Sequence, residues 1–284
     1  MVKTIDKKYI DLILLLLVLI MVKAVGSYEK TPAYNNTPYN FSEDYAGAVK
    51  YIVTAAEMDI ASVDSYPQKI AKVFSHKPRY QASVLVKNQS YFSLPTVPYE
   101  RYEYDEVVLQ YLEPTELIES EDLLVTELAA EFAKGQTSIM GIVSKALSWN
   151  TQNISYDNEI DDDIFYGNTP PQSAKTTITR RKGYCTDYAN TFIATMRALG
   201  IPARYVVGVA QLHQELHGKQ TQLSYYAWAE FYLKDYGWIP VDTQQGKVGV
   251  PNYYIKLFTG KDHFECKGLS KLCNINAEMV PVLE

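Results

Sequence analysis

The feature that most constrains the fold of this chain is a cysteine at the start of a predicted amphipathic helix. Cys185 closes the segment Arg180-Arg-Lys-Gly-Tyr-Cys185, which carries three cations. Beyond it, four apolar residues at helical spacing share one face: Ala189, Phe192, Ile193 and Met196. Gly200 ends the helix, because glycine takes the left-handed conformation without strain, and Pro202 prevents its continuation. The pattern predicts a helix of fixed length that carries a thiol at its N-terminus.

Three strands are predicted after this helix. The first strand is predicted at residues 203–210. The other two, at residues 225–233 and 237–242, are predicted to form an antiparallel pair. If that pair turns tightly, Tyr226 and Asp242 are diagonal neighbours on one face of the sheet. The alternative for Asp242 is a turn residue at the end of a strand.

Thiol catalysis needs a thiolate, a group that carries the proton and a group that orients this carrier. A helix N-terminus and nearby cations stabilise the thiolate and so lower the pKa of a cysteine. Both are expected at Cys185, the cations being Arg180, Arg181 and Lys182. The alternative is a buried structural cysteine that behaves as a small hydrophobic residue.

Four segments follow one another in an informative order and spacing: Gly183-Tyr-Cys-Thr-Asp-Tyr-Ala189, Arg197-Ala-Leu-Gly-Ile-Pro-Ala-Arg204, Ala227-Trp-Ala-Glu-Phe-Tyr-Leu233 and Trp238-Ile-Pro-Val-Asp242. On these segments, residues 113–244 resemble the transglutaminase-like superfamily of the microbial secreted type. The resemblance implies an α+β fold of the papain-like type, with a nucleophile helix packed on an antiparallel sheet. It also implies a Cys–His–Asp triad that hydrolyses peptide or isopeptide bonds or transfers an acyl group to an amine. Cys185 would be the nucleophile, and Asp242 would orient the base.

The chain departs from this pattern at Tyr226, which occupies the position of the family histidine. A phenol has a pKa near 10 and accepts no proton from a thiol at neutral pH, although it can donate a hydrogen bond. Three hypotheses remain. The domain is catalytically silent and acts in binding or structure; or a rearranged base, His213 or His217, serves a thiol-dependent peptidase, amidase or acyl transferase; or Cys185, Tyr226 and Asp242 act together in an unfamiliar mechanism.

The N-terminus predicts export. Lys3, Lys7 and Lys8 precede an apolar run at residues 10–22, so residues 1–26 are predicted to be a signal peptide or an N-terminal membrane anchor. The alternative is a buried core helix. Four Asn-x-Ser/Thr sequons agree with an exported glycoprotein: Asn35, Asn40, Asn88 and Asn153. The expected location is secreted or membrane-anchored, and the expected partners are peptide or protein segments at the cell surface or cell wall.

The rest of the chain divides around the predicted domain. Residues 27–112 form an N-terminal extracellular region of unknown role, residues 113–250 the transglutaminase-like domain, and residues 251–284 a C-terminal extension. In an oxidising compartment Cys266 and Cys273 could close a small loop, which leaves Cys185 unpaired.

Local signals predict several helices outside the Cys185 segment. A helix is expected from Ser42, on apolar residues spaced from Ala46 to Ala56. A second helix is expected to be capped by Ser120, to end at Gly135 and to bury three residues, Leu124, Leu128 and Phe132; a third is expected from Ser138. Residues 79–94 predict two strands around a turn at Asn88.

Charge and composition exclude some classes of ligand. A net charge of -6 argues against nucleic acid as a partner, because phosphate binding needs a basic surface. Residues 157–163 are acidic, but the glycine that an EF-hand needs at its sixth position is Asp162, and position twelve is Asn168. A solvated acidic loop is therefore expected there, and neither a metal ion nor a cofactor is predicted.

Overall fold

The computed structural model describes most of the chain from residue 48 onwards. The described ranges are 48–55, 59–75, 80–87, 94, 96–157, 170–212, 222–266 and 278–281. All of them belong to one unit, Tyr39–Glu284. The predicted signal peptide or anchor, three of the four sequons (Asn35, Asn40 and Asn88), His213 and His217 lie outside the described residues.

A five-stranded antiparallel sheet forms the centre of this unit, in the order β10-β6-β7-β8-β9. Its strands are β6 (Ala203–Leu212), β7 (Gln222–Leu233), β8 (Gly237–Asp242), β9 (Lys247–Val248) and β10 (Tyr254–Gly260). The three strands predicted from the sequence are confirmed as β6, β7 and β8. Because β10 pairs with β6, this sheet extends beyond the boundary expected at residue 250.

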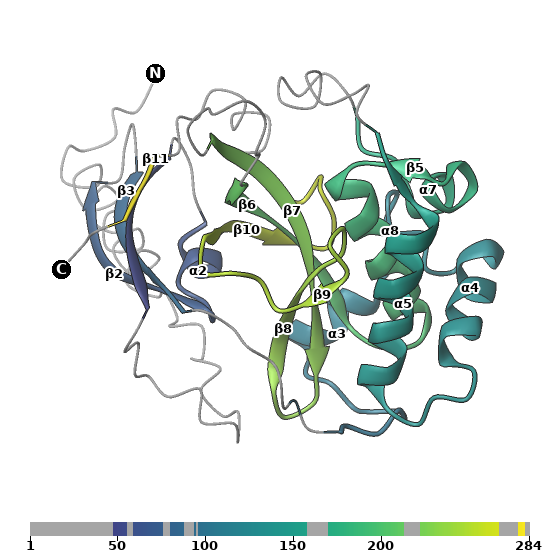
Figure 1. Ribbon diagram of the computed structural model, residues 1–284. Helices are drawn as coiled ribbons and strands as arrows, with labels where there is room; N and C mark the ends of the chain where they lie inside the picture. Colours follow the sequence, from purple (N-terminus) through teal and green to yellow (C-terminus); the bar gives the residue numbers. More distant parts are fainter. Residues whose placement is uncertain are drawn as a thin grey trace, which may run out of the picture. The chain divides into compact units, whose positions relative to one another are not determined.

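Four helices gather beside this sheet in Figure 1: α4 (Leu123–Ala133), α5 (Ile139–Asn153), α7 (Ala174–Arg180) and α8 (Cys185–Ala198). Helix α8 contacts β6, β7 and the other three helices. It is buried almost all round. Its predicted apolar face is confirmed, since all four residues of that face are buried: Ala189, Phe192, Ile193 and Met196. Inside it the Thr195 hydroxyl donates to the Thr191 carbonyl at 3.1 Å, so this buried polar group has a partner. Gly200 follows with a φ of 73°, as its predicted role requires.

The start of α4 differs from the sequence prediction. The N-cap is Asp122, whose carboxylate accepts from the Leu124 N–H at 2.9 Å; Ser120 lies before it. The inward face is shifted accordingly and consists of Val125, Ala129 and Phe132, while Leu124 is exposed. The predicted cap of α5 is confirmed, because the Ser138 hydroxyl accepts from the Gly141 N–H at 3.2 Å.

The helix predicted from Ser42 is wrong in the part that the structure describes. These residues form β1 (Val49–Ala55) in a second antiparallel sheet of order β11-β1-β3-β2, with β2 (Gln68–Ser75), β3 (Tyr80–Val86) and β11 (Glu278–Pro281). Tyr51 and Val53 are buried and alternate with partly exposed neighbours, which is the period of a strand. The predicted strand from residue 79 is confirmed as β3, and the turn at Asn88 lies outside the described residues.

Short elements complete the unit. They are α2 (Ile60–Val63), α3 (Glu106–Leu109), the 3-10 turn η1 (Gln110–Leu112), β4 (Ser155–Tyr156) and β5 (Lys182–Gly183). Strands β4 and β5 pair in parallel. The acidic loop that starts at Asp157 was expected to be solvated. This is wrong for Asp157 itself, which is buried and forms an ion pair with Lys182 at 2.9 Å.

A buried ionic network ties β10 to the segment before β2. Glu230 on β7 is fully buried and accepts from Arg204 Nε and Lys256 Nζ, each at 2.7 Å. The Lys256 ammonium also donates to the Tyr66 carbonyl at 3.2 Å, and its backbone N–H donates to Gln68 Oε1 at 2.9 Å. Because the Glu230 carboxylate and the Lys256 ammonium are both buried, removing one of them would leave the other as an uncompensated buried charge.

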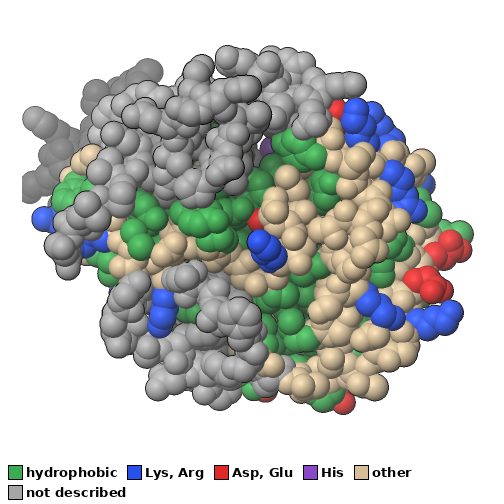
Figure 2. All heavy atoms as spheres, in the orientation of Figure 1, with side chains coloured by type: hydrophobic (Ala, Val, Ile, Leu, Met, Phe, Trp, Pro, Cys, Tyr) green, Lys and Arg blue, Asp and Glu red, His purple; other side chains and the backbone are tan. Residues whose placement is uncertain are grey.

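Three further observations bear on the predictions. Cys266 is buried with a free thiol, and Cys273, with which it was expected to close a loop, lies outside the described residues. Among the described residues no helix is long and apolar enough to cross a membrane. On the face in Figure 2, the Lys and Arg side chains of the described residues stand in separate small groups.

Candidate functional site

The thiol of Cys185 lies at the first position of α8, directly after the extended N-cap residue Tyr184. The Asp187 carboxylate accepts from the Tyr184 backbone N–H at 3.1 Å, which fixes the chain where it enters the helix. Cys185 is partly buried and packs against a cluster that includes Tyr226 and Trp228.

Tyr226 and Asp242 meet as the strand pairing predicts. Strands β7 and β8 pair with Ala229 opposite Val241, which makes Tyr226 and Asp242 diagonal neighbours. The Tyr226 hydroxyl donates to Asp242 Oδ1 at 2.9 Å. The structure therefore brings all three predicted site residues into one neighbourhood, with the phenol of Tyr226 bonded to the carboxylate of Asp242.

Asp242 is buried and accepts four hydrogen bonds. Besides Tyr226, the backbone N–H groups of Gln244 and Gln245 donate to Oδ1 at 3.2 and 2.9 Å, and the Tyr254 hydroxyl donates to Oδ2 at 2.9 Å. Asp242 is thus both a partner of the site and a turn residue at a strand end. These donors hold the carboxylate in a fixed orientation.

The sequence analysis missed Tyr254. It lies on β10, which pairs with β6 and not with β7, and its ring centroid lies 5.2 Å from that of Tyr226. No motif around residue 254 signals this contact, because it depends on the strand order of the sheet.

Electrostatics make the thiol and the phenol poor partners for proton transfer. Burial raises the pKa of Cys185 to about 12; the charges of Asp187 and Asp242 raise it further, whereas hydrogen bonds from the backbones of Ala227 and Thr186 lower it. Burial, and then the charge of Asp242, hold the pKa of Tyr226 far above its usual 10. At neutral pH both groups therefore keep their protons.

The expected cationic activation of the thiol is a wrong prediction. Arg180 donates to Gln172 Oε1 at 2.7 Å, and the Arg181 guanidinium lies 4.5 Å from the centroid of the Trp149 ring. Lys182 forms the ion pair with Asp157 described above. The three side chains thus have partners of their own, and dense packing around the sulfur decides its pKa.

One histidine, His263, lies within the described part of the chain, and the sequence analysis did not single it out. Its Nδ1 lies 3.4 Å from the Tyr205 hydroxyl, which in turn is 3.0 Å from Thr186 Oγ1. Burial lowers the pKa of His263, so the ring is neutral at neutral pH. Its link to the helix start therefore runs through two hydroxyl groups. Within the described ranges, no three His, Cys, Asp or Glu side chains cluster as metal ligands would.

Comparisons with known proteins agree with this fold. Residues 126–243 match the family described as the transglutaminase-like superfamily. A Haemophilus influenzae protein described as uncharacterized is 29% identical over 161 residues, which cover 51% of this chain. The chain spans only 42% of that relative's length.

One solved structure shares the overall fold of this chain. The crystal structure of a candidate cysteine protease from Cytophaga hutchinsonii matches with a TM-score of 0.53 and 22% identity, covering 83% of this chain and 86% of that one. The periplasmic domain of TgpA from Pseudomonas aeruginosa has a TM-score of 0.39 and 20% identity, over 59% of this chain and 54% of its own. The α+β fold expected from the sequence is confirmed. Residues 126–243, which carry Cys185, Tyr226 and Asp242, belong to the transglutaminase-like superfamily.

Proposed function

We propose that this chain is an exported protein whose transglutaminase-like domain binds peptide or protein segments at the cell surface without turning them over. The observation that carries the proposal is the hydrogen bond from Tyr226 to Asp242 Oδ1. The resemblance to the family places its histidine at residue 226. The Tyr226 phenol already donates a hydrogen bond to a carboxylate, and its pKa is raised. Such a group does not take the proton of a thiol.

The size of the expected loss of catalytic rate supports a catalytically silent site. Loss of a positioned general acid–base lowers a rate by about 100- to 10,000-fold. At Cys185 this adds to a raised thiol pKa, which leaves little thiolate at neutral pH. Each effect alone would weaken catalysis, and they act on the same proton.

The location is proposed from the N-terminal sequence. Residues 1–26 combine cations with an apolar run and precede the sequons. Fractionation of cells that express the full chain, with N-terminal sequencing of the recovered protein, tests this. Recovery of the uncleaved chain from the cytosol alone would contradict export.

Turnover assays separate binding from catalysis. The parent, Cys185→Ala, Tyr226→Phe and Tyr226→His are compared for hydrolysis of peptide and isopeptide substrates and for incorporation of an amine. We expect the parent and Tyr226→Phe to match Cys185→Ala. We expect Tyr226→His to exceed them, since Asp242 can orient a ring N–H.

Activity of the parent that disappears in Cys185→Ala would refute the silent site. In that case the double variant His213→Ala/His217→Ala identifies a rearranged base, because activity that survives it would leave the Cys–Tyr–Asp arrangement. Equal and negligible rates in the parent and Cys185→Ala support a binding role.

A further inference from the structure

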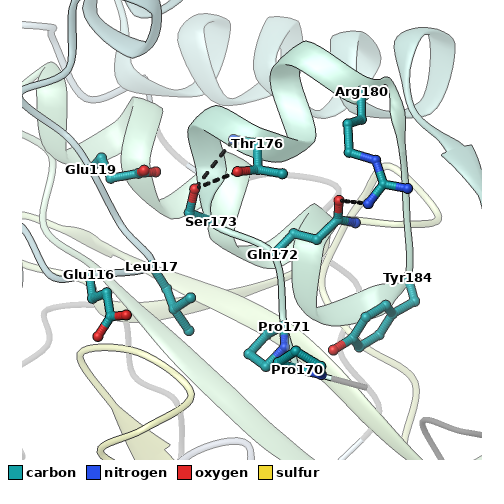
Figure 3. A pocket seen from close by; sticks show the side chains of 10 residues that line it. All are labelled: Glu116, Leu117, Glu119, Pro170, Pro171, Gln172, Ser173, Thr176, Arg180 and Tyr184. Atoms are coloured by element: carbon teal, nitrogen blue, oxygen red, sulfur yellow. Dashed lines mark hydrogen bonds between the residues drawn. The ribbon is translucent and has the colours of Figure 1, made fainter. Parts of the chain in front are cut away.

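A hollow of about 540 Å³ lies beside Tyr184, the residue that precedes Cys185. This volume falls within the range of pockets that bind small molecules, about 300–1,000 Å³. Figure 3 shows Glu116 and Glu119 on one side of the hollow, with Arg180 and Tyr184 on the other. The two sides therefore carry opposite charges.

The hydrogen bonds of Gln172 hold the wall between these charges in place. Its backbone N–H and its Nε2 donate to the two carboxylate oxygens of Asp187, both at 2.8 Å. Its backbone carbonyl accepts from Asn190 Nδ2 at 2.8 Å, and its Oε1 accepts from Arg180. Asp187 and Asn190 are fully buried on α8. The wall is thus anchored to the helix that begins at Cys185, and its side chains need no reordering to receive a ligand.

The charged groups are also fixed in ways that suit a ligand. Glu119 Oε2 accepts from the Lys175 backbone N–H at 2.9 Å, which holds this carboxylate at the hollow. The bond from Arg180 to Gln172 uses Nη1, and a guanidinium has five N–H donors in a fork that matches a carboxylate. Ser173 and Thr176 add hydroxyls to the same wall, 3.1 Å apart.

We propose that this hollow binds a short zwitterionic peptide, with its free ammonium at Glu116 and Glu119 and its free carboxylate at Arg180. The inference rests on the proposed binding role and names its ligand class. The same ligand chemistry is present in a free dipeptide and in the unblocked end of a cross-linked peptide. The tests below distinguish these two sources.

Calorimetric titration of the full chain with alanyl-alanine measures the affinity directly. N-acetyl-alanyl-alanine lacks the ammonium, and alanyl-alanine amide lacks the carboxylate. We expect alanyl-alanine to bind at least tenfold more tightly than each of these two blocked forms. An isopeptide-linked dipeptide that binds more tightly than alanyl-alanine would identify the cross-linked source.

Charge variants assign the two ends. Glu116→Gln/Glu119→Gln should weaken alanyl-alanine at least tenfold but leave the N-acetyl form unchanged. Arg180→Gln should weaken alanyl-alanine and leave the amide unchanged. Glu131, an exposed residue of α4 that pairs with Lys134, is not among the residues that line the hollow, so Glu131→Gln removes one negative charge elsewhere and should change nothing. Circular dichroism confirms that each variant is folded.

No saturable binding of alanyl-alanine by the parent overturns the inference, as do equal affinities for the blocked forms or variant effects no larger than that of Glu131→Gln. The titrations are repeated in Cys185→Ser, so that turnover by the parent, which would refute the silent site, does not obscure binding at the hollow. If the parent is inactive and binds longer peptides unaffected by Arg180→Gln, the hollow is wrong while the binding role stands.

Discussion

Alkylation of Cys185 by iodoacetamide should be slow at neutral pH and should keep accelerating far into the alkaline range. Packing around the sulfur raises the pKa of this thiol to about 12, whereas an ordinary cysteine has a pKa near 8.5. Since the thiolate is the reactive species, the pH profile of labelling reports this pKa directly.

The expected rate follows from two opposing factors. At pH 7.5 a pKa of about 12 leaves about 3 thiolates in 100,000, against about 1 in 10 for an ordinary cysteine, a ratio of about 3,000. A more basic thiolate is intrinsically more nucleophilic, and a Brønsted slope of about 0.45 over this difference returns a factor of about 40. The folded protein should therefore be labelled about 100-fold more slowly than the unfolded chain.

Mass spectrometry of the tryptic peptide 183–197 follows this thiol separately from Cys266 and Cys273. The same peptide, labelled in guanidinium chloride, is the internal reference. The folded rate should rise tenfold per pH unit between pH 7 and 10. Restricted access of iodoacetamide would lower the labelling rate by the same factor at every pH and would not move the midpoint of the pH profile. The shape of this profile therefore separates restricted access from a raised pKa.

A rate that levels off below pH 9 would refute the reasoning, since the thiol would then be an ordinary or activated one. Tyr226→His is the matched variant, because an imidazole beside the sulfur can accept its proton. We expect this variant to be labelled at least tenfold faster at pH 7.5, with its plateau at lower pH.

Three other contacts give measurable outcomes. Tyr254→Phe removes a hydroxyl from buried Asp242 and should lower the free energy of unfolding in urea by about 1–3 kcal/mol; no change would contradict that hydrogen bond. Burial raises the pKa of Asp187 from 3.8 to about 6, so its contribution to stability, about 3 kcal/mol, is largest below pH 3.8 and is lost as the pH rises through 6; a pKa below 4 by carboxyl NMR titration would refute this. Glu230→Gln leaves Lys256 buried without its carboxylate and should cost about 3–5 kcal/mol in thermal unfolding, and a loss below about 1 kcal/mol would contradict it.

Helix α8 could be predicted from sequence because its signals are local. Its apolar face, Gly200 and Pro202 all act within a few residues of the helix itself. Strand β1 could not, since its apolar residues fit a helical period nearly as well, and its partners β3 and β11 lie far along the chain. Pairing across such distances overrides local preference.

The same distinction explains the site. Tyr226 and Asp242 could be placed together because they flank one tight turn, and strand pairing then fixes their geometry. The cations of residues 180–182 illustrate the limit, since closeness in sequence to Cys185 did not bring them to its sulfur. Tyr254 shows the converse, because its contact with Asp242 depends on the order of strands in the sheet.

The contacts of Asp242 argue that residue 226 decides what the thiol can do. Tyr254 occupies Oδ2 and Tyr226 occupies Oδ1, while two backbone N–H groups hold the carboxylate in place. A histidine at position 226 would meet Oδ1 with a ring N–H, as the phenol now meets it with its hydroxyl. Its other ring nitrogen would then be an acceptor on the side of Cys185. One substitution thus converts a group that only donates a proton into one that also accepts it, while the strands, the turn and the carboxylate remain unchanged.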